Sequence, residues 1–463
     1  MAEKEFQSLI KLTMELNDYL LTPLYLGLIY AIAFAIRPSV TNRYTKQYFI
    51  PALTLKVVGA LALGILYHTI YAGDTNNYFY HGEIIYKAFG DSFSAGFELL
   101  TTNGTRTPTI EPYVSQMAWF GKDSNEYFVV RMAGLGAILG FNTYSVTALL
   151  FAVLSFSGMW AMYMTFAKIR PQVYKELAVA VFFLPSVFFW GSGLLKDSLC
   201  IGALGWLFYA FYRGAIEKKN IIRCLVVGVV AVKVIASMKV YILLAFIPPA
   251  ALWVFNENTA RIKSPAIRWV VRPFVIAAGL AVATYGMSAV AAADARFNLD
   301  KIGEQSKMTA TYLQGVSKTE NGSGYNIGEQ DGTLSGMAKL APQAIVVALF
   351  RPFLWESRNP TMLLSAIEAT YFIVLTVRIF FRVGVLKTLG AIVSSPVLTL
   401  CFVFSLIFAI SVGISSGNFG TLVRYKIPLM PFYLAGLYIM QSMTQGMIKR
   451  KQQSVTARQS QFA

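Results

Sequence analysis

Long apolar windows recur along this chain and limit the folds that it can adopt. A helix needs roughly 17–25 mostly apolar residues to cross about 30 Å of hydrocarbon. About eleven windows of that length are present, and each predicts one membrane span. They cover 22–37, 49–71, 143–166, 174–191, 196–212, 221–236, 239–256, 269–292, 361–382, 395–414 and 426–444. The sequence therefore predicts an all-α fold, a polytopic transmembrane helical bundle in which 1–463 form a single transmembrane domain.

The composition also excludes a soluble globule. Hydrophobic residues make up 56% of the 463 residues, charged residues make up 14%, and the mean hydropathy is +0.54. A soluble domain of this length is less apolar. The formal net charge is +17, but the Lys and Arg residues lie in short loops and form no long basic run. We therefore predict no nucleic-acid partner and interpret the charge as a topology signal.

The positions of the basic residues predict the orientation in the membrane. Cytoplasmic loops hold an excess of Lys and Arg. If Arg37, Arg43 and Lys46 face the cytoplasm, alternate connections follow them there, and each has a net charge between +2 and +4. These connections are 37–47, 167–176, 213–223, 256–272, 378–387 and 447–463. The pattern predicts a multi-pass protein of the cell (inner) membrane.

Two long connections fall on the opposite, extracytoplasmic side. The first, 72–131, is acidic and is expected to contain amphipathic helices, and the second is 293–360. Within the second, 337–354 is apolar, but a crossing there would place later basic loops outside, so we predict a surface-lying or re-entrant helix. Long ordered loops are usually functional. We therefore expect the extracytoplasmic face to be the working face.

An acidic residue follows the second predicted span directly. Asp74 lies in Tyr71-Ala-Gly-Asp-Thr-Asn-Asn-Tyr-Phe-Tyr80. Such a carboxylate is either a solvated group at the membrane surface or a functional one. The aromatic side chains around it fit an interfacial belt and equally a surface that contacts sugar rings. They are Tyr71, Tyr78, Phe79 and Tyr80.

Metal binding is weakly indicated in the same segment. His81 and Glu83 follow Asp74 closely, so a divalent cation, Mg²⁺ or Mn²⁺, could be shared by Asp74 and a neighbour. A metal site needs a larger set of ligands than one His and scattered carboxylates. We therefore assign no metal ligands and no certain cofactor.

Lys196 and Asp197 lie in the predicted external turn Trp190-Gly-Ser-Gly-Leu-Leu-Lys-Asp-Ser198. Two adjacent ionisable residues at the edge of the lipid are costly unless they are paired or used. They could form a local ion pair that caps a helix. Alternatively, Gly191 and Gly193 could let a ligand approach the backbone closely.

More cations occur on the side that positive-inside statistics disfavour. Arg424 and Lys426 precede the last predicted span, and Lys233 and Lys239 lie near an external helix end. An anionic partner such as a phosphate would explain them, because Arg offers a bidentate fork and Lys a point charge. The other interpretation is that they extend to lipid headgroups.

The end of the second long loop mixes aromatic and charged residues. Arg351, Trp355 and Glu356 fit carbohydrate stacking and hydroxyl recognition, and equally an interfacial Trp beside an ion pair. Glu368, inside the following span, is a candidate functional acid whose expected partner is a basic residue from another span.

Several short motifs together resemble the GT-C superfamily of integral membrane glycosyltransferases. They are Gly73-Asp-Thr-Asn-Asn-Tyr78, the amphipathic stretch ending in Arg131, Leu184-Pro-Ser with Leu195-Lys-Asp-Ser198, and Arg424-Tyr-Lys-Ile-Pro-Leu-Met-Pro431. Members of that superfamily take their sugar from a polyprenyl-phosphate-linked donor.

The resemblance implies a role for each matched position. Asp74 would be the catalytic acid/base residue of an inverting transfer, and the cations Lys196, Arg424, Lys426 and Lys233 would bind the donor phosphate. Substrate-binding residues would be Tyr78, Asp197, Arg351, Trp355 and Glu356. The implied partners are the polyprenyl-phosphate-linked sugar, a glycan or lipid acceptor and membrane lipids, in cell-envelope glycan or polysaccharide biosynthesis.

Two other functions fit the sequence. A polysaccharide polymerase or ligase of the same fold class would also join a glycan to a lipid-linked donor. A lipid-linked glycan flippase or transporter would need polar residues through the depth of its spans. The span centres are nearly free of charge, and this favours catalysis over transport.

Overall fold

The computed structural model describes residues 15–69, 73–259, 302–319 and 323–459. Within these ranges the chain is helical, and the only strand-like pairing is an isolated bridge between Gly324 and Asn418. Seven of the described helices are long and apolar enough to cross a membrane. They are α2 (Leu16–Val40), α3 (Lys46–Thr69), α8 (Tyr144–Ile169), Lys196–Ile216, α12 (Ile221–Lys239), α17 (Pro360–Val383) and α19 (Pro396–Ser415). The predicted all-α polytopic class is confirmed, with seven such helices among the described residues, where about eleven spans were predicted for the whole chain.

The predicted span 174–191 does not form one continuous helix. The chain forms a 3-10 turn at Pro171–Val173 and two short helices, α9 (Tyr174–Phe182) and α10 (Pro185–Trp190). Pro185 has no backbone N–H to donate, and its ring disfavours helical geometry at Leu184. A continuous helix therefore ends before this proline.

The remaining predicted spans have other outcomes. Window 239–256 forms α13 (Tyr241–Thr259), whose apolar part Tyr241–Glu257 is shorter than a full span. Window 426–444 becomes helical only at Met430, where α21 (Met430–Gln459) begins. Window 269–292 and Tyr71 lie outside the described residues.

The chain forms two compact units. Unit 1 comprises residues 1–164, 186–210 and 220–240, and unit 2 comprises 165–185, 211–219 and 241–463.

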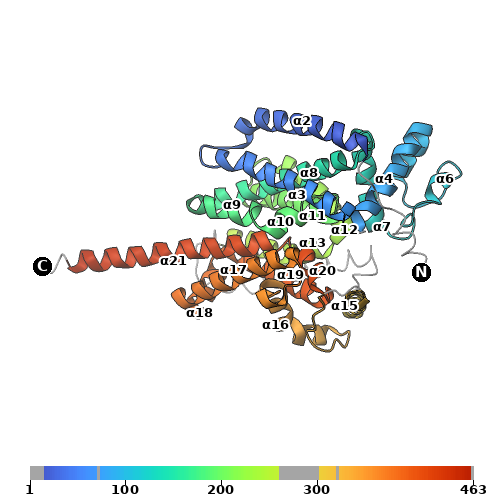
Figure 1. Cartoon of the computed structure of the whole chain (residues 1–463). Helices are drawn as coiled ribbons and strands as arrows, with labels where there is room; N and C mark the ends of the chain where they lie inside the picture. The colour runs from blue at the N-terminus through green and yellow to red at the C-terminus, as the bar shows by residue number, and fades with distance from the viewer. Residues whose placement is uncertain (1–14, 70–72, 260–301, 320–322, 460–463) are drawn as a thin grey trace. The chain divides into compact units, whose positions relative to one another are not determined.

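In unit 1, α2 and α8 are held side by side and run in the same direction (Figure 1). The buried carboxylate of Asp18 accepts the backbone N–H of Ser145 at 2.9 Å and its hydroxyl, which caps the start of α8. Farther along both helices, the indole of Trp160 donates to the Val40 carbonyl at 3.0 Å. The predicted topology has both helices run from the extracytoplasmic to the cytoplasmic side, and the observed direction agrees with it.

Glycine residues allow α8 to approach α11 (Lys196–Ala210) closely. A Cβ atom at Gly158 would collide with the carbonyl of Gly202, and one at Gly205 would collide with the carbonyl of Gly158. Small residues at such positions let two membrane helices pack backbone to backbone. This contact fixes the position of α11, whose first turn carries Lys196 and Asp197.

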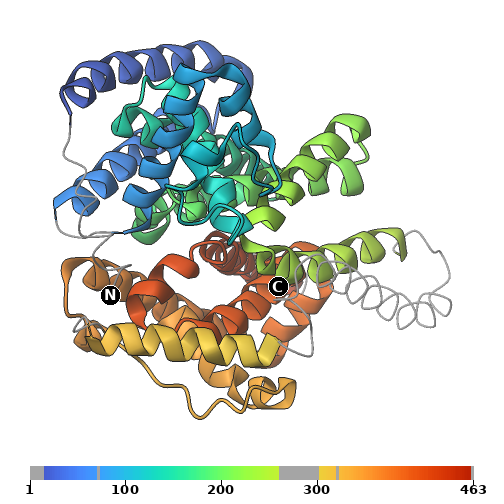
Figure 2. The same ribbon diagram turned by 90° about the vertical axis from the view of Figure 1, so that its right-hand side faces the viewer.

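The first predicted external loop forms four helices. They are α4 (Asp74–Asp91), α5 (Phe93–Thr101), α6 (Glu111–Val114) and α7 (Ser124–Leu139). Helix α4 packs against α5 and α7, and α7 also packs against α12 (Figure 2). The loop is therefore an ordered helical layer attached to the spans of unit 1.

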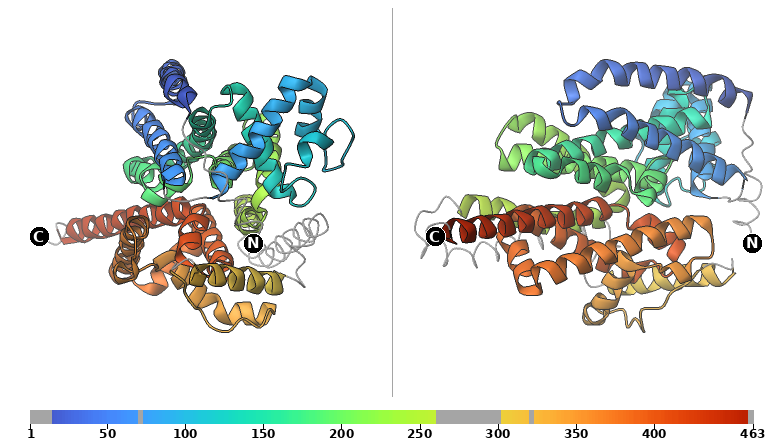
Figure 3. Two further views of the ribbon diagram at one scale, coloured as in Figure 1. Left: turned by 45° about the vertical axis from the view of Figure 1, so that its right-hand side comes forward. Right: turned by 60° about the vertical axis from the view of Figure 1, so that its left-hand side comes forward.

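In unit 2, the very apolar α19 is the central helix. Helices α13, α16 (Leu334–Phe350), α15 (Ile302–Thr319), α18 (Val385–Ser394) and α21 all pack against it. Helix α17 packs against α21, against the short α20 (Phe419–Tyr425) and against a 3-10 turn at Leu354–Glu356 (Figure 3). These contacts bring the end of the second predicted loop next to the residues that precede α21.

Candidate functional site

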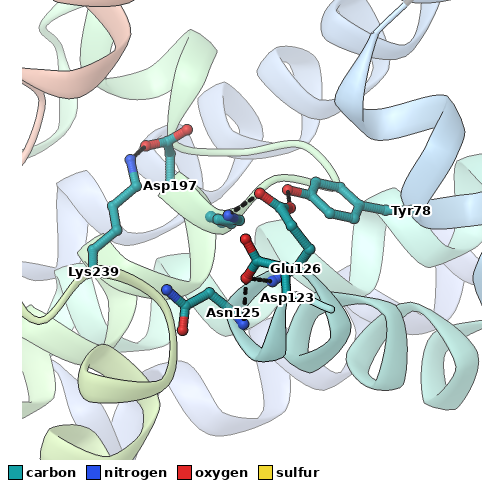
Figure 4. A network of polar contacts seen from close by, with 7 residues as sticks. Tyr78, Asp123, Asn125, Glu126, Asp197 and Lys239 are labelled. Atoms are coloured by element: carbon teal, nitrogen blue, oxygen red, sulfur yellow. Dashed lines mark hydrogen bonds and ion pairs between the residues drawn. The ribbon is translucent and has the colours of Figure 1, made fainter. Parts of the chain in front are cut away.

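In unit 1, the predicted site residues Tyr78 and Lys196 form a polar cluster around the carboxylate of Glu126. Asp123 caps α7 by accepting the backbone N–H groups of Asn125 at 2.9 Å and Glu126 at 3.3 Å, so Glu126 is fixed in the first helical turn. One carboxylate oxygen accepts the Tyr78 hydroxyl of α4, and the other accepts the Lys196 ammonium of α11 (Figure 4). Three segments that are distant in sequence therefore meet on one carboxylate.

This ion pair remains open to solvent. The Lys196 side chain is 15% exposed and the Glu126 side chain 23%. Both partners are therefore partly accessible from outside the protein. A cation that is neither fully solvated nor fully buried suits the binding of a phosphate.

A second ion pair begins at the next residue of the chain. Asp197 pairs with Lys239, the last residue of α12, and the two side chains are 0% and 7% exposed (Figure 4). In the first turn of α11, Lys196 therefore pairs with the partly exposed carboxylate of Glu126, and Asp197 pairs with the buried ammonium of Lys239. Buried charges of this kind need their partner, because an uncompensated charge in the interior is very costly.

A lysine of α3 stabilises the glycine-containing turn, 191–195, that precedes Lys196. The Lys56 ammonium donates to the carbonyls of Gly191 at 2.7 Å and Val187 at 3.4 Å, and to the Ser155 hydroxyl at 3.2 Å. A Cβ at Gly191 would lie 3.1 Å from that ammonium nitrogen, and one at Gly193 would lie 2.7 Å from Leu63 Cδ2. Side chains of the protein, rather than a ligand, therefore fill the space beside both glycines.

Asp74 occupies the start of the helix that carries Tyr78. It follows the N-cap residue Gly73, where a carboxylate is favoured by the helix dipole, and it is partly exposed. Asp74 and Tyr78 are four residues apart and lie on the same face of α4. The predicted catalytic acid/base residue is thus one helical turn from a direct partner of Glu126.

An aromatic wall adjoins this cluster. The Trp119 ring lies 5.4 Å from the Tyr78 ring and 4.8 Å from the His81 ring, measured between centroids. His81 is 2% exposed, and its Nε2 accepts the Ala118 N–H at 3.4 Å. Burial lowers the pKa of His81 to about 4, so the ring is neutral at physiological pH.

The two side chains that were considered as metal ligands beside Asp74, His81 and Glu83, both have partners within the protein. His81 accepts a hydrogen bond from the backbone, and Glu83 pairs with Lys87 at 2.8 Å. Among the described residues, no three His, Cys, Asp or Glu side chains are grouped as metal ligands.

Unit 2 holds its own cluster of predicted site residues. The Arg351 guanidinium pairs with Glu356 and lies 4.9 Å above the Phe419 ring. The buried Lys426 ammonium donates to the Arg351 carbonyl at 3.0 Å and interacts electrostatically with Glu368. Glu368 thus has a basic neighbour, but Lys426 lies in the turn between α20 and α21 and not in another span as predicted, and it is already engaged within the protein.

Three further predicted residues differ in their setting. Trp355 is 81% exposed and stacks on Phe353 at 4.8 Å, which gives a flat aromatic surface. Arg424 is partly exposed on α20. Lys233 is exposed on α12, and the residue of that helix that reaches Asp197 is Lys239.

The structure therefore divides the predicted site residues between the units. Unit 1 carries the first group and unit 2 the second. The first group is Asp74, Tyr78, Lys196, Asp197 and Lys233, and the second is Arg351, Trp355, Glu356, Arg424 and Lys426.

Sequence reasoning missed Glu126, Lys56 and Trp119. The run Asp123-Ser-Asn-Glu126 before an apolar stretch is a helix-start signal that could have placed Glu126 in a first turn. Lys56 could have been noticed as a charge inside a predicted span. The contacts of Glu126 and Lys56 with the segment that ends in Lys196 depend on long-range packing, which the spacing of residues does not reveal.

No protein-family model, no curated protein and no solved structure matches this chain. What the fold defines is the class: the chain is a multi-pass helical membrane protein.

Proposed function

We propose that this protein is a membrane glycosyltransferase that takes a sugar from a polyprenyl-phosphate-linked donor and transfers it on the extracytoplasmic face. One observation carries the proposal. The acidic segment that begins at Asp74 and the turn that ends in Lys196, two of the motifs that resemble the GT-C superfamily, meet at the Glu126 carboxylate.

The chemistry requires the groups that this cluster supplies. The acceptor hydroxyl oxygen attacks the anomeric carbon, the bond from that carbon to the phosphate oxygen breaks, and the sugar configuration inverts. Negative charge grows on the departing phosphate, and the Lys196 ammonium is the cation proposed to stabilise it. Asp74 takes the proton of the acceptor hydroxyl.

The charges inside the spans of unit 1 support catalysis over transport. Lys56 lies in the middle of α3, but its ammonium is satisfied by two carbonyls and one hydroxyl and is 1% exposed. It therefore fixes the glycine turn and does not line a polar path. The polymerase or ligase and the flippase remain alternative hypotheses that the experiment below helps to separate.

The test is the identity of the lipid that the protein retains. We expect the wild type, purified from its native membrane into nanodiscs, to hold a polyprenyl phosphate or its glycosylated form, identified by mass spectrometry. Lys196→Met should lower its occupancy about ten-fold or more, because it removes a charge-assisted contact. Lys168→Met is the matched control, since Lys168 is 48% exposed and pairs with Glu217.

Two outcomes would count against the proposal. Retention of bulk phospholipid alone, equally in all variants, would remove the polyprenyl donor. A bound polyprenyl-linked glycan that is carried across the bilayer by reconstituted protein, without any sugar transfer, would assign a flippase instead.

A further inference from the structure

We infer that Glu126 is an exchangeable counter-ion that occupies the phosphate-binding position of Lys196 until a phosphate headgroup replaces it. The inference rests on the proposed function and adds to it a residue that controls the affinity for the donor. No motif of the sequence pointed to Glu126, and its role follows from three contacts of its carboxylate and backbone.

The first reason is that Lys196 is held by a group that a ligand can displace. The Glu126–Lys196 pair is partly exposed on both sides, so solvent screens it more than it screens a fully buried pair. A phosphate carries more negative charge and more acceptor oxygens than a carboxylate, so it is the stronger partner for an ammonium. Exchange of carboxylate for phosphate is therefore favoured at Lys196.

The second reason is that Glu126 keeps a donor after the exchange. Its two carboxylate oxygens have separate partners, the Lys196 ammonium on Oε1 and the Tyr78 hydroxyl on Oε2. Loss of the ammonium leaves the Tyr78 hydrogen bond in place, and the Asp123 cap still fixes the backbone of Glu126. The carboxylate can thus release Lys196 and recover it without unfolding the start of α7.

The neighbouring ion pair, Asp197–Lys239, is one that a ligand cannot separate. Asp197 is 0% exposed and pairs with the buried Lys239. A headgroup arriving from solvent has no access to that pair. Of these two neighbouring pairs, only Glu126–Lys196 is partly exposed, so it is the one at which a ligand can exchange.

The experiment measures the affinity of the purified, delipidated full chain in nanodiscs for undecaprenyl phosphate, with undecaprenol as the probe that lacks the phosphate. We expect Glu126→Gln to tighten undecaprenyl phosphate binding about five-fold, because the competing anion is gone. Lys196→Met should weaken binding, and the double variant should show no gain. Glu111→Gln is the matched control, because Glu111 forms an exposed pair with Arg106 in the same loop.

The outcomes separate this inference from the proposed function. If the wild type binds undecaprenyl phosphate better than undecaprenol but Glu126→Gln binds it equally or more weakly, the exchange is wrong and the donor site stands. If the wild type does not distinguish the two lipids, the proposed donor site fails. A five-fold gain for phosphatidic acid alone would support the exchange but assign it to a bulk-lipid headgroup.

If Glu126→Gln fails to fold, a second variant tests the inference. Glu126→Asp keeps the charge and withdraws the carboxylate by one methylene, so it should also tighten binding, by a smaller factor. Weaker binding in this variant, with the unfolding temperature of the wild type, would overturn the inference.

Discussion

Two ion pairs that begin at adjacent residues of α11 behave as opposites. Lys196 reaches a carboxylate at the surface of the cluster, where both partners are partly exposed, whereas Asp197 reaches an ammonium in the interior, where both are buried. Exposed pairs contribute little to stability, and their members can take other partners. Buried pairs cannot lose one member without a large penalty. The first pair is therefore suited to ligand binding and the second to holding α11 against α12.

The largest expected effect comes from breaking the buried pair. Lys239→Met leaves the Asp197 carboxylate without its cation in the interior, and this should cost about 3–5 kcal/mol of unfolding free energy. Thermal unfolding in detergent measures the loss. The double variant Asp197→Leu/Lys239→Met should recover much of it, since no charge is left uncompensated. A single variant with wild-type stability would show that this pair does not hold the two helices.

A smaller loss of stability is expected on acidification. The pKa of His81 is lowered to about 4 by burial, below the value of about 6.5 in an unfolded chain. Between these values the unfolded state binds a proton that the folded state does not, so stability falls as the pH decreases from about 6.5 toward 4. The loss from pH 7.5 to pH 5 should be on the order of 2 kcal/mol.

His81→Asn supplies the comparison for this pH effect. Asn does not titrate, so the variant should show a flatter dependence of unfolding temperature on pH over the same range. Equal slopes for the wild type and the variant would mean that other groups carry the acid sensitivity.

Breaking the exposed pair should separate stability from binding. Lys196→Met should lower the unfolding free energy by less than Lys239→Met does, because its pair with Glu126 is partly exposed and therefore more screened by solvent than the buried pair. The same variant should lose retained polyprenyl phosphate, as measured by mass spectrometry of the purified protein. A stability loss as large as that of Lys239→Met would erase the difference between the two pairs.

The smallest effect on stability is expected at Trp355. Its ring is 81% exposed and stacks only on Phe353 among the rings of the described residues. Trp355→Ala should leave the unfolding temperature nearly unchanged and weaken binding of a glycan acceptor by removing a stacking surface. Binding of oligosaccharides followed by tryptophan fluorescence, with Trp253→Phe in the buried interior as the reference variant, measures this.

The sequence predicted the parts of the fold that depend on local apolar length. The windows 49–71 and 395–414, for example, became α3 and α19 with small shifts at their ends. It did not predict the break within 174–191, because hydropathy averages over a window and does not register that Pro185 interrupts the helix. Hydropathy reports how apolar a segment is. It does not report whether the segment forms one unbroken helix.

The candidate site was predictable only in part. Asp74, Tyr78 and Lys196 could be proposed because each is a polar or aromatic residue at the end of an apolar segment. Glu126 could not be assigned as their partner, because it lies 70 residues before Lys196 in the chain and meets it only in the folded structure, where α7 and α11 both pack against α12. The choice of Lys239 over Lys233 as the partner of Asp197 likewise depends on which face of α12 is buried.

The measurement that tests the proposed chemistry most directly is sugar transfer by the purified protein and its Asp74→Asn variant. The assay would use a panel of polyprenyl-phosphate-linked hexoses and an extract of the native envelope glycans as acceptor. We predict that the variant retains the donor as the wild type does but transfers sugar about 10²–10⁴-fold more slowly, because the base is gone. Transfer at the wild-type rate by Asp74→Asn would contradict the account.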